Sequence, residues 1–157
     1  MKRVYIASPL GFAASTTAFM HELIARLEGM VEIENPWDDV RFADDFSDIG
    51  RMQNYSERVS RLEVINHELG KTNAERIDKS DAVLAILDGV DVDSGTAAEI
   101  GYAFAKGKRV YGLRTDFRLA GDNIGSIVNL QVQYFIEASG GRIVTDLDAF
   151  VACAKEL

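Results

Sequence analysis

Residues 82–113 read AVLAILDGVDVDSGTAAEIGYAFAKGKRVYGL and carry the pattern from which the fold follows. The first six, AVLAIL (82–87), are all apolar, which is typical of a strand buried on both faces of a parallel sheet. The stretch 93–106 predicts a loop and a helix that ends at Gly107, and RVYGL (109–113) predicts another strand. A strand, a helix and a second strand in this order indicate parallel neighbours in one sheet.

The rest of the chain continues this alternation. Short apolar segments predict further strands at 3–8, 31–35 and 142–145. Periodic apolar residues predict helices at 15–27, at 55–79 with Gly70 as a candidate kink, after Asp146, and over part of 124–138. Five strands separated by helices predict an α/β protein. We expect a single doubly wound domain, 1–157, with a five-stranded parallel sheet and a flavodoxin-like strand order.

One segment, PWDDVRFADDFSDIGRMQ (36–53), is polar and acidic and follows neither pattern. We predict that it is irregular, and long loops of this kind are often functional lids. Ligands of doubly wound folds bind outside the carboxyl ends of the strands. The turn after Ser8, the loop from Trp37 and the loop before Glu99 are therefore expected to surround one crevice. The sequence leaves open whether Trp37 stacks on a ligand there or merely packs.

Composition narrows the classes of function. The 157 residues suit one domain with a single core. A net charge of −8 argues against a nucleic-acid or anionic-membrane partner. Cys153 is the only cysteine, which excludes an internal disulfide, and neither His21 nor His67 belongs to a cluster with metal-ligand spacing. We expect no metal and a reducing, cytoplasmic setting.

The N-terminal segment loosely resembles a signal peptide, because Lys2 and Arg3 precede a fairly apolar stretch. Pro9 and Gly11 interrupt that stretch, so a first strand and a turn explain it better. No segment approaches the ~20 apolar residues that a membrane-spanning helix requires.

Glu99 has two interpretations. Thr96 to Glu99 match a capping box, in which the two residues satisfy each other's backbone donors and Glu99 is structural. Three features favour chemistry: Gly95 leaves room for a ligand, the helix dipole favours an ionised carboxylate, and Asp93 brings a second acid to the crevice. The chain has no Gly-rich phosphate loop of the Walker or dinucleotide type. Spacing alone leaves the choice open.

Over nearly its whole length the chain resembles the nucleoside 2-deoxyribosyltransferase family. The core D-x-G-x-x-x-E-x-G-x-A, here Asp93 to Ala103, is fairly specific when it follows a buried strand. The other matching pieces are VYIASP (4–9), NAERIDKSDAVLAIL (73–87) and the RTDFR…DN…NL segment (114–130). The resemblance implies an enzyme that exchanges the base of 2'-deoxyribonucleosides, with deoxynucleosides and free nucleobases as small-molecule partners and with no cofactor.

The resemblance also implies a role for each matching residue. Glu99 would be the nucleophile that attacks the anomeric carbon, and Tyr5 would hydrogen-bond and position its carboxylate. Asp93, with Gly95 beside it, would bind the sugar hydroxyls. Asn129 would reach toward the sugar's 5' end from a neighbouring subunit, so we expect a homo-oligomer built from dimers with shared active sites. A carboxylate next to an anomeric carbon stabilises oxocarbenium character and then captures it as an ester, which gives exchange with retention.

Three of these residues also have structural interpretations that the sequence leaves open. Tyr5 suits a buried core position with a satisfied hydroxyl, Asp93 suits a turn or a helix N-cap, and Asn129 suits a cap or a loop. The segment IVNLQVQYFI (127–136) favours an interface on its own account. It carries more apolar and aromatic side chains than a single amphipathic face needs, although the same face could cover the sheet.

Two positions depart from the family pattern. Asn73 stands where many members carry an aspartate that protonates the leaving base. An amide cannot donate such a proton, though it can bind the substrate by a hydrogen bond to the edge of the base. Some members, including protozoan ones, resemble this chain in having asparagine there. Either another acid, such as Asp38 or Asp39, protonates the base, or the preferred base leaves without a strong acid. Gln131 replaces a frequent methionine and makes its wall of the pocket more polar.

Two other functions compete with this hypothesis. Hydrolases of the same superfamily cleave deoxynucleoside or cytidine 5'-monophosphates and tend to carry serine where Asp93 stands. A carboxylate would repel the phosphate by several kcal/mol at short range, so Asp93 favours free nucleosides. The remote alternative is a non-catalytic flavodoxin-like module. Asp88 superficially matches a phosphoacceptor of the receiver type, but residues 8–12 supply no acidic pair.

Overall fold

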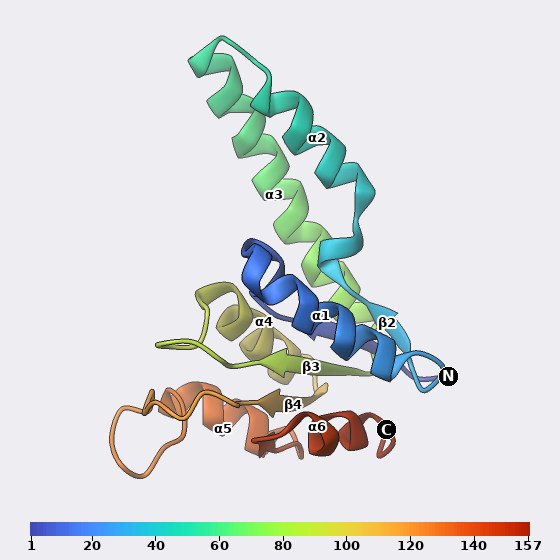
Figure 1. Ribbon diagram of the computed structural model, residues 1–157, viewed down its shortest axis with the longest axis vertical. Coiled ribbons are helices and arrows are strands. Elements are labelled where there is room, and N and C mark those ends of the chain that lie inside the picture. Colours follow the sequence, from blue (N-terminus) through green and yellow to red (C-terminus); the bar gives the residue numbers. More distant parts are fainter.

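The computed structural model describes residues 1–157 and contains one five-stranded sheet (Figure 1). Its strands are β1 (Arg3–Ala7), β2 (Glu32–Glu34), β3 (Ala82–Ile86), β4 (Arg109–Leu113) and β5 (Ile143–Val144). They lie in the order β2-β1-β3-β4-β5, and every neighbouring pair is parallel. This is the flavodoxin-like strand order, so the predicted fold class is confirmed.

Helices connect the strands. In chain order the helical elements are η1 (Leu10–Phe12), α1 (Ala14–Leu27), η2 (Pro36–Asp38), α2 (Val40–Gly50), α3 (Tyr55–Lys79), α4 (Ser94–Ala105), α5 (Leu130–Ala138) and α6 (Leu147–Ala154), where η denotes a short 3-10 helix. α3 spans its predicted range and runs through Gly70 without interruption. Asp146 caps α6 as predicted, since its side chain accepts a hydrogen bond from the amide of Ala149.

Each face of the sheet is covered by its own set of helices. α1 and α6 pack on one face, and α3, α4 and α5 pack on the other. Because side chains alternate along a strand, Val4 and Ile6 of β1 join the first core, whereas Tyr5 and Ala7 join the second. β3 is buried at every residue, which accounts for its uninterrupted apolar sequence. Tyr5 is thereby placed on the face that carries α3 and α4.

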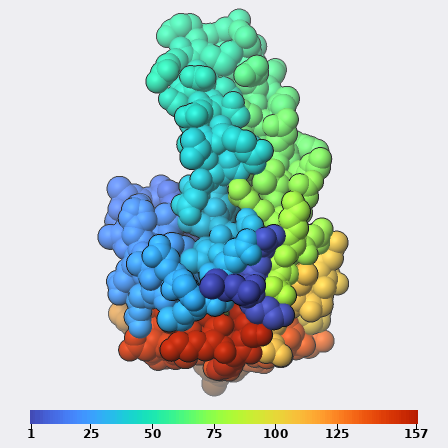
Figure 2. All heavy atoms as spheres, turned by 90° about the vertical axis from the view of Figure 1, so that its right-hand side faces the viewer, coloured from blue at the N-terminus to red at the C-terminus, as the bar shows by residue number.

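The segment 36–53 is not the irregular loop that its sequence predicted. Most of it forms α2, which Asp39 caps by accepting a hydrogen bond from the amide of Arg41. Phe42 and Ile49 lie on one face of α2 and pack with Ile65 of α3 in a small separate core. The prediction was wrong because few apolar residues carry the helical period and acidic residues separate them. α2 and α3 form a hairpin that projects from the body of the protein (Figures 1 and 2).

α4 begins one turn earlier than the capping box predicted. Asp93 is the N-cap, and its Oδ2 accepts a hydrogen bond of 2.9 Å from the amide of Thr96. Thr96 is the third residue of the helix and is buried, and Glu99 lies in the second turn, beyond the reach of the cap. Asp93 is as good a cap as Thr96 in local terms, and the longer helix buries the Thr96 side chain. The structural interpretation of Asp93 as an N-cap is therefore correct.

The helices also bear on the question of membrane insertion. α3 is the longest helix, and charged residues occur along its whole length. No helix in the chain has the length and the apolar content that crossing a bilayer requires.

Candidate active site

Glu99 is held by a side chain from the other end of the sequence. It projects from α4 toward β1, where the hydroxyl of Tyr5 donates a hydrogen bond of 2.6 Å to Glu99 Oε1. Tyr5 is fully buried in the core between the sheet and the helices. Its ring is therefore fixed by packing, and its hydroxyl orients the carboxylate.

A third element reaches the same carboxylate. Asn73, near the C-terminal end of α3, donates from Nδ2 to Glu99 Oε1 over 3.4 Å. Neither contact uses Oε2, the second oxygen of the carboxylate. The other polar atom of the amide, Asn73 Oδ1, is buried and has no hydrogen-bond partner.

Burial shifts the pKa values of Glu99 and Tyr5. It raises the pKa of Glu99 to about 7; the hydrogen bond from Tyr5 opposes this rise and the negative charge of Asp93 adds to it. Glu99 lies in the second turn of α4, whereas the helix dipole acts mainly within the first turn, so burial has the largest effect on its pKa. Burial and then the charge of Glu99 raise the pKa of Tyr5 far above its ordinary value, so the phenol stays protonated as a donor.

Glu99 opens into a pocket of about 370 Å³ at the carboxyl ends of the strands, at the foot of the α2–α3 hairpin. The three segments predicted to surround one crevice do meet here. Its apolar wall consists of Phe12, Pro36, Trp37, Phe46 and Leu69. Its polar wall consists of Ser8, Asn66, Asn73, Asp93, Thr96 and Glu99, with Gly95 at the start of α4.

Trp37 is fixed in the wall by its packing. Its indole Nε1 donates to the carbonyl oxygen of Ser8 over 3.0 Å, and its ring meets the edge of Phe12 at a centroid distance of 4.6 Å. Gly11 lies against the indole so closely that a Cβ there would come within 2.1 Å of a ring carbon. The indole N–H is thus occupied by the protein, and the contacts with Phe12 and Gly11 fix the ring in the wall of the pocket.

Asp93 and Gly95 shape the start of α4. Asp93 Oδ2 accepts from both the amide and the hydroxyl of Thr96, over 2.9 Å and 3.3 Å. A Cβ at Gly95 would lie 3.1 Å from that same oxygen. A side chain at Gly95 would therefore crowd the carboxylate, which supports the prediction that glycine keeps this part of the pocket open.

Asp38 and Asp39 are not placed to protonate a ligand, contrary to one of the alternatives that the sequence left open. Neither lines the pocket. Asp39 is held by Arg76 at 2.7 Å and by Arg41 at 2.8 Å, and its side chain is only 6% exposed. The hydrogen bond from Arg41 lowers the pKa of Asp39 in particular, so it stays ionised.

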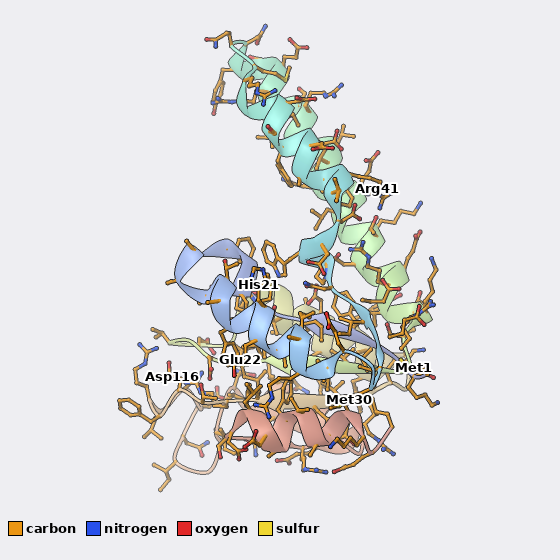
Figure 3. The ribbon with its side chains drawn as sticks, turned by 45° about the vertical axis from the view of Figure 1, so that its right-hand side comes forward. Met1, His21, Glu22, Met30, Arg41 and Asp116 are labelled. Carbon is orange, nitrogen blue, oxygen red and sulfur yellow. The ribbon has the colours of Figure 1, made fainter.

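Asn129 and Gln131 lie outside the pocket of their own chain. Asn129 caps α5, and its Oδ1 accepts from the amides of Gln131 at 3.0 Å and Val132 at 3.4 Å. Gln131 is exposed. Both follow the long loop after β4, which extends away from the body (Figure 1). Figure 3 shows Asp116 of this loop far from Arg41 of the hairpin.

Several pocket residues were missed from the sequence. Phe46 lies in α2. Because this segment was predicted to be a loop, the place of Phe46 in the pocket wall could not be predicted. Asn66 and Leu69 share one helix face of α3 with Asn73, which was predicted, at the i, i+3, i+7 spacing, and this spacing was the available signal. Ser8 carried no signal beyond its place at the end of β1. No group of three or more His, Cys, Asp or Glu side chains is arranged to hold a metal ion.

Comparisons with known proteins identify the family of the chain. A family model described as Nucleoside 2-deoxyribosyltransferase matches residues 4–131, a range that includes every residue of the pocket. A search of curated protein sequences finds no match.

Solved structures resemble the chain along almost all of its length. A conserved protein from Enterococcus faecalis V583 has a TM-score of 0.70 at 22% identity, with coverage of 99% of this chain and 98% of that chain. A 2-desoxiribosyltransferase from Leishmania mexicana has a TM-score of 0.68 at 24% identity, with the same coverage, 99% and 98%. A CMP N-glycosidase from Clostridium botulinum has a TM-score of 0.57 at 19% identity and coverage of 97% of both chains. At these identities the likeness shows the fold.

Proposed function

The chain belongs to the nucleoside 2-deoxyribosyltransferase family, and we propose that it exchanges the base of 2'-deoxyribonucleosides through a covalent glycosyl-enzyme on Glu99, with retention of configuration. The observation that carries the proposal is the geometry of Glu99. Its Oε1 accepts hydrogen bonds from Tyr5 and Asn73, whereas Oε2 takes part in neither contact. The carboxylate thus has one oxygen held in place and a second oxygen available at the pocket.

The proposed reaction has two displacements at one carbon. Glu99 Oε2 forms a bond to the anomeric carbon of the deoxyribose while the bond from that carbon to the base nitrogen breaks, and the electron pair leaves with the base. The departing base takes up a proton from water. A nitrogen of a second base then attacks the same carbon, gives its proton to water and releases the carboxylate. Each step inverts the configuration, so the two together retain it.

The neighbouring side chains have distinct roles in this scheme. Tyr5 positions the carboxylate and stabilises its ionised form. Asp93 has its Oδ2 engaged by Thr96 in the cap of α4 and directs its other oxygen to the sugar hydroxyls. Asn73 supplies no proton, and Asp39 is held as an ion pair. In this scheme the base therefore leaves without a strong general acid from either residue.

One assay tests the activity directly. Purified protein is incubated with deoxyadenosine and cytosine, and separately with deoxyinosine and adenine, and the products are separated by chromatography. We expect the new deoxynucleoside in each case. Free deoxyribose with no new nucleoside would indicate a hydrolase, and unchanged substrates would contradict an enzymatic role.

The pKa of Glu99 leads to a pH prediction. The active form is the carboxylate, which is present above the pKa of about 7 and is lost as the pH falls through it. We expect kcat/KM to fall about tenfold per pH unit below that value. Tyr5→Phe removes the hydrogen bond that lowers the pKa and should move this acid limb to higher pH. Tyr55→Phe, at an exposed tyrosine of α3, is the control and should leave the limb in place. A limb near pH 4.5 would contradict the prediction.

We further propose that the enzyme is a homo-oligomer in which Asn129 completes the site of an adjacent chain. Apolar side chains around the start of α5 support this proposal: Ile127 is 45% exposed, Leu130 is 53% exposed and Tyr134 is 56% exposed. In the preceding loop Phe117 and Ile124 are almost wholly exposed. Several exposed apolar side chains within one stretch of the chain are typical of an interface.

Mixing two inactive variants tests the shared site. Asn129→Ser is suited to the experiment because serine keeps the N-cap of α5 but shortens the side chain. Glu99→Gln and Asn129→Ser chains are each expected to lack most activity. Subunit exchange between them should restore part of it, because a hybrid dimer gathers both defects in one site and leaves the other intact. An active monomer by light scattering, or no recovery despite proven exchange, would contradict the shared site.

A further inference from the structure

One ion pair joins the two segments that supply half of the pocket wall. Six of the twelve residues that line the pocket come from residues 36–46 and from α3. Where these segments meet, Arg76 of α3 donates a hydrogen bond of 2.7 Å to Asp39 Oδ2. Asp39 is also the N-cap of α2. The pair therefore connects the start of α2 to the side of α3.

This pair is largely shielded from water. The side chain of Asp39 is 6% exposed and that of Arg76 is 18% exposed. Arg76 also faces Glu34 of β2, whose Oε2 lies 3.7 Å from Arg76 Nε. Water and salt screen an exposed ion pair, whereas the loss of one member of a buried pair leaves a buried charge without a partner. A movement of α2 away from α3 is consequently opposed at this point.

Arg41 pairs with the same carboxylate oxygen but makes only a local contact. Its guanidinium lies 2.8 Å from Asp39 Oδ2, and its side chain is 72% exposed. Figure 3 shows Arg41 at the foot of the hairpin. Because Arg41 follows Asp39 by two residues, its contact does not reach α3. Of the two arginines that pair with Asp39, only Arg76 joins separate elements.

The hairpin that the pair anchors has a small core of its own. It projects from the body of the protein (Figures 1 and 2), and its three buried residues are Phe42, Ile49 and Ile65. Phe46 lies on α2 between the first two of these in sequence, and it lines the pocket. The distance of Phe46 from α3 thus depends on how the start of α2 is held.

Arg76 lies on the same face of α3 as two pocket residues. Leu69, Asn73 and Arg76 follow the i, i+4, i+7 spacing of one helix face, and the first two line the pocket. Asn73 in turn contacts Glu99. The ion pair therefore lies about one helical turn from the reacting groups.

We propose that Arg76 is a positioning residue, which through Asp39 fixes the spacing between α2 and α3 and holds the pocket at the width that the nucleoside requires. This inference rests on the proposed function, since it concerns the same site. Neither Asp39 nor Arg76 lines the pocket, so the pair acts on substrate binding through the walls and not on the bonds that form and break. Its loss should raise KM and leave kcat nearly unchanged.

The test compares Arg76→Met with Arg41→Met, which each remove one cation from Asp39 and keep a long side chain. KM for deoxyadenosine and kcat are measured with saturating cytosine at about pH 8.5, where Glu99 is ionised. We expect Arg76→Met to raise KM by about ten- to hundredfold, as a misplaced binding wall would, with kcat within about threefold of the wild type. Arg41→Met should change neither value by more than about twofold.

A second substitution tests whether the two residues act as a pair. Asp39→Asn removes the charge and keeps a good N-cap for α2, and by itself it should reproduce the rise in KM. In the double variant Asp39→Asn/Arg76→Met, KM should rise no further than in Arg76→Met alone, because both changes break one contact. Effects that add would show that Arg76 does not act through Asp39.

Hydrogen exchange, followed by mass spectrometry, tests the anchoring of α2 without catalysis. The amides of α2 should exchange at least about tenfold faster in Arg76→Met than in the wild type. Exchange in α6, which packs on the other face of the sheet, should not change, and Arg41→Met should resemble the wild type throughout. Unchanged exchange in α2, or a fall in kcat without a rise in KM, overturns the inference. If the wild type exchanges no bases, the proposed function is overturned, and exchange in α2 then decides by itself whether Arg76 anchors the hairpin.

Discussion

Glu99→Gln is expected to reduce base exchange by at least about a thousandfold, because an amide oxygen cannot displace the base and form a stable ester. The substitution keeps the size of the side chain and an oxygen that can accept from Tyr5. It also removes a carboxyl group that burial disfavours in its ionised form, as the raised pKa indicates. The thermal midpoint of unfolding should therefore stay equal to that of the wild type or rise. Rates are measured by chromatography and unfolding by circular dichroism.

A covalent trap locates the bond that forms. A 2-fluoro-2-deoxynucleoside slows the breakdown of a glycosyl-enzyme, so the wild type should accumulate an adduct that peptide mass spectrometry maps to Glu99. Glu63→Gln is the matched control, because Glu63 is an exposed glutamate on the hairpin helix α3, and it should retain full activity and the adduct. An adduct on another residue, or a Glu99→Gln variant with most of its activity, would contradict the assignment of the nucleophile.

Free deoxynucleosides should be turned over at least about a hundredfold better than their 5'-monophosphates. The reason is electrostatic: a phosphate dianion near the Asp93 carboxylate meets a repulsion of several kcal/mol at an effective dielectric constant of about 20. The measurement compares kcat/KM for deoxyadenosine and deoxyadenosine 5'-monophosphate. A wild type that prefers the monophosphate would place the protein among hydrolases of the CMP N-glycosidase type.

Asp93→Ser should reduce the difference in kcat/KM between free deoxynucleosides and their 5'-monophosphates, because it removes the negative charge. The structure makes the variant practicable, since Asp93 is the N-cap of α4 and serine is a comparably good cap. Asp146→Ser is the control, because Asp146 caps α6 in the same manner and lies outside the pocket. It should leave the preference for free nucleosides unchanged. If the two variants alter the preference equally, the charge of Asp93 is not its cause.

Several features of this protein were determined by the sequence alone. The apolar run 82–87, the strand at 109–113 and the ends of α3 at Tyr55 and Lys79 are local patterns, and the structure reproduces them. Their order along the chain was sufficient for the flavodoxin-like fold, because parallel strands with intervening helices allow few topologies. The family followed from the motif around Glu99, which is contiguous in sequence.

The path of residues 36–53 was decided by tertiary contacts. α2 is held by the packing of Phe42 and Ile49 on α3. Two such residues in an acidic segment are too weak a pattern to reveal a partner that lies elsewhere in the chain. The start of α4 was ambiguous for a related reason. Asp93 and Thr96 are both good caps, and local chemistry does not rank them.

The chemistry of the site depended on the tertiary structure more than any feature of the fold did. Tyr5 and Glu99 are 94 positions apart in the chain, yet they form a hydrogen bond of 2.6 Å. The raised pKa of Glu99 comes from burial, and burial depends on how β1, α3 and α4 pack together. The unpaired oxygens of Ser8 and Asn73 likewise exist only in the folded protein. The sequence supplies the functional groups. Their charge and their free hydrogen-bonding atoms depend on the distances between side chains and on the exclusion of water. Both arise only when segments distant in sequence pack together.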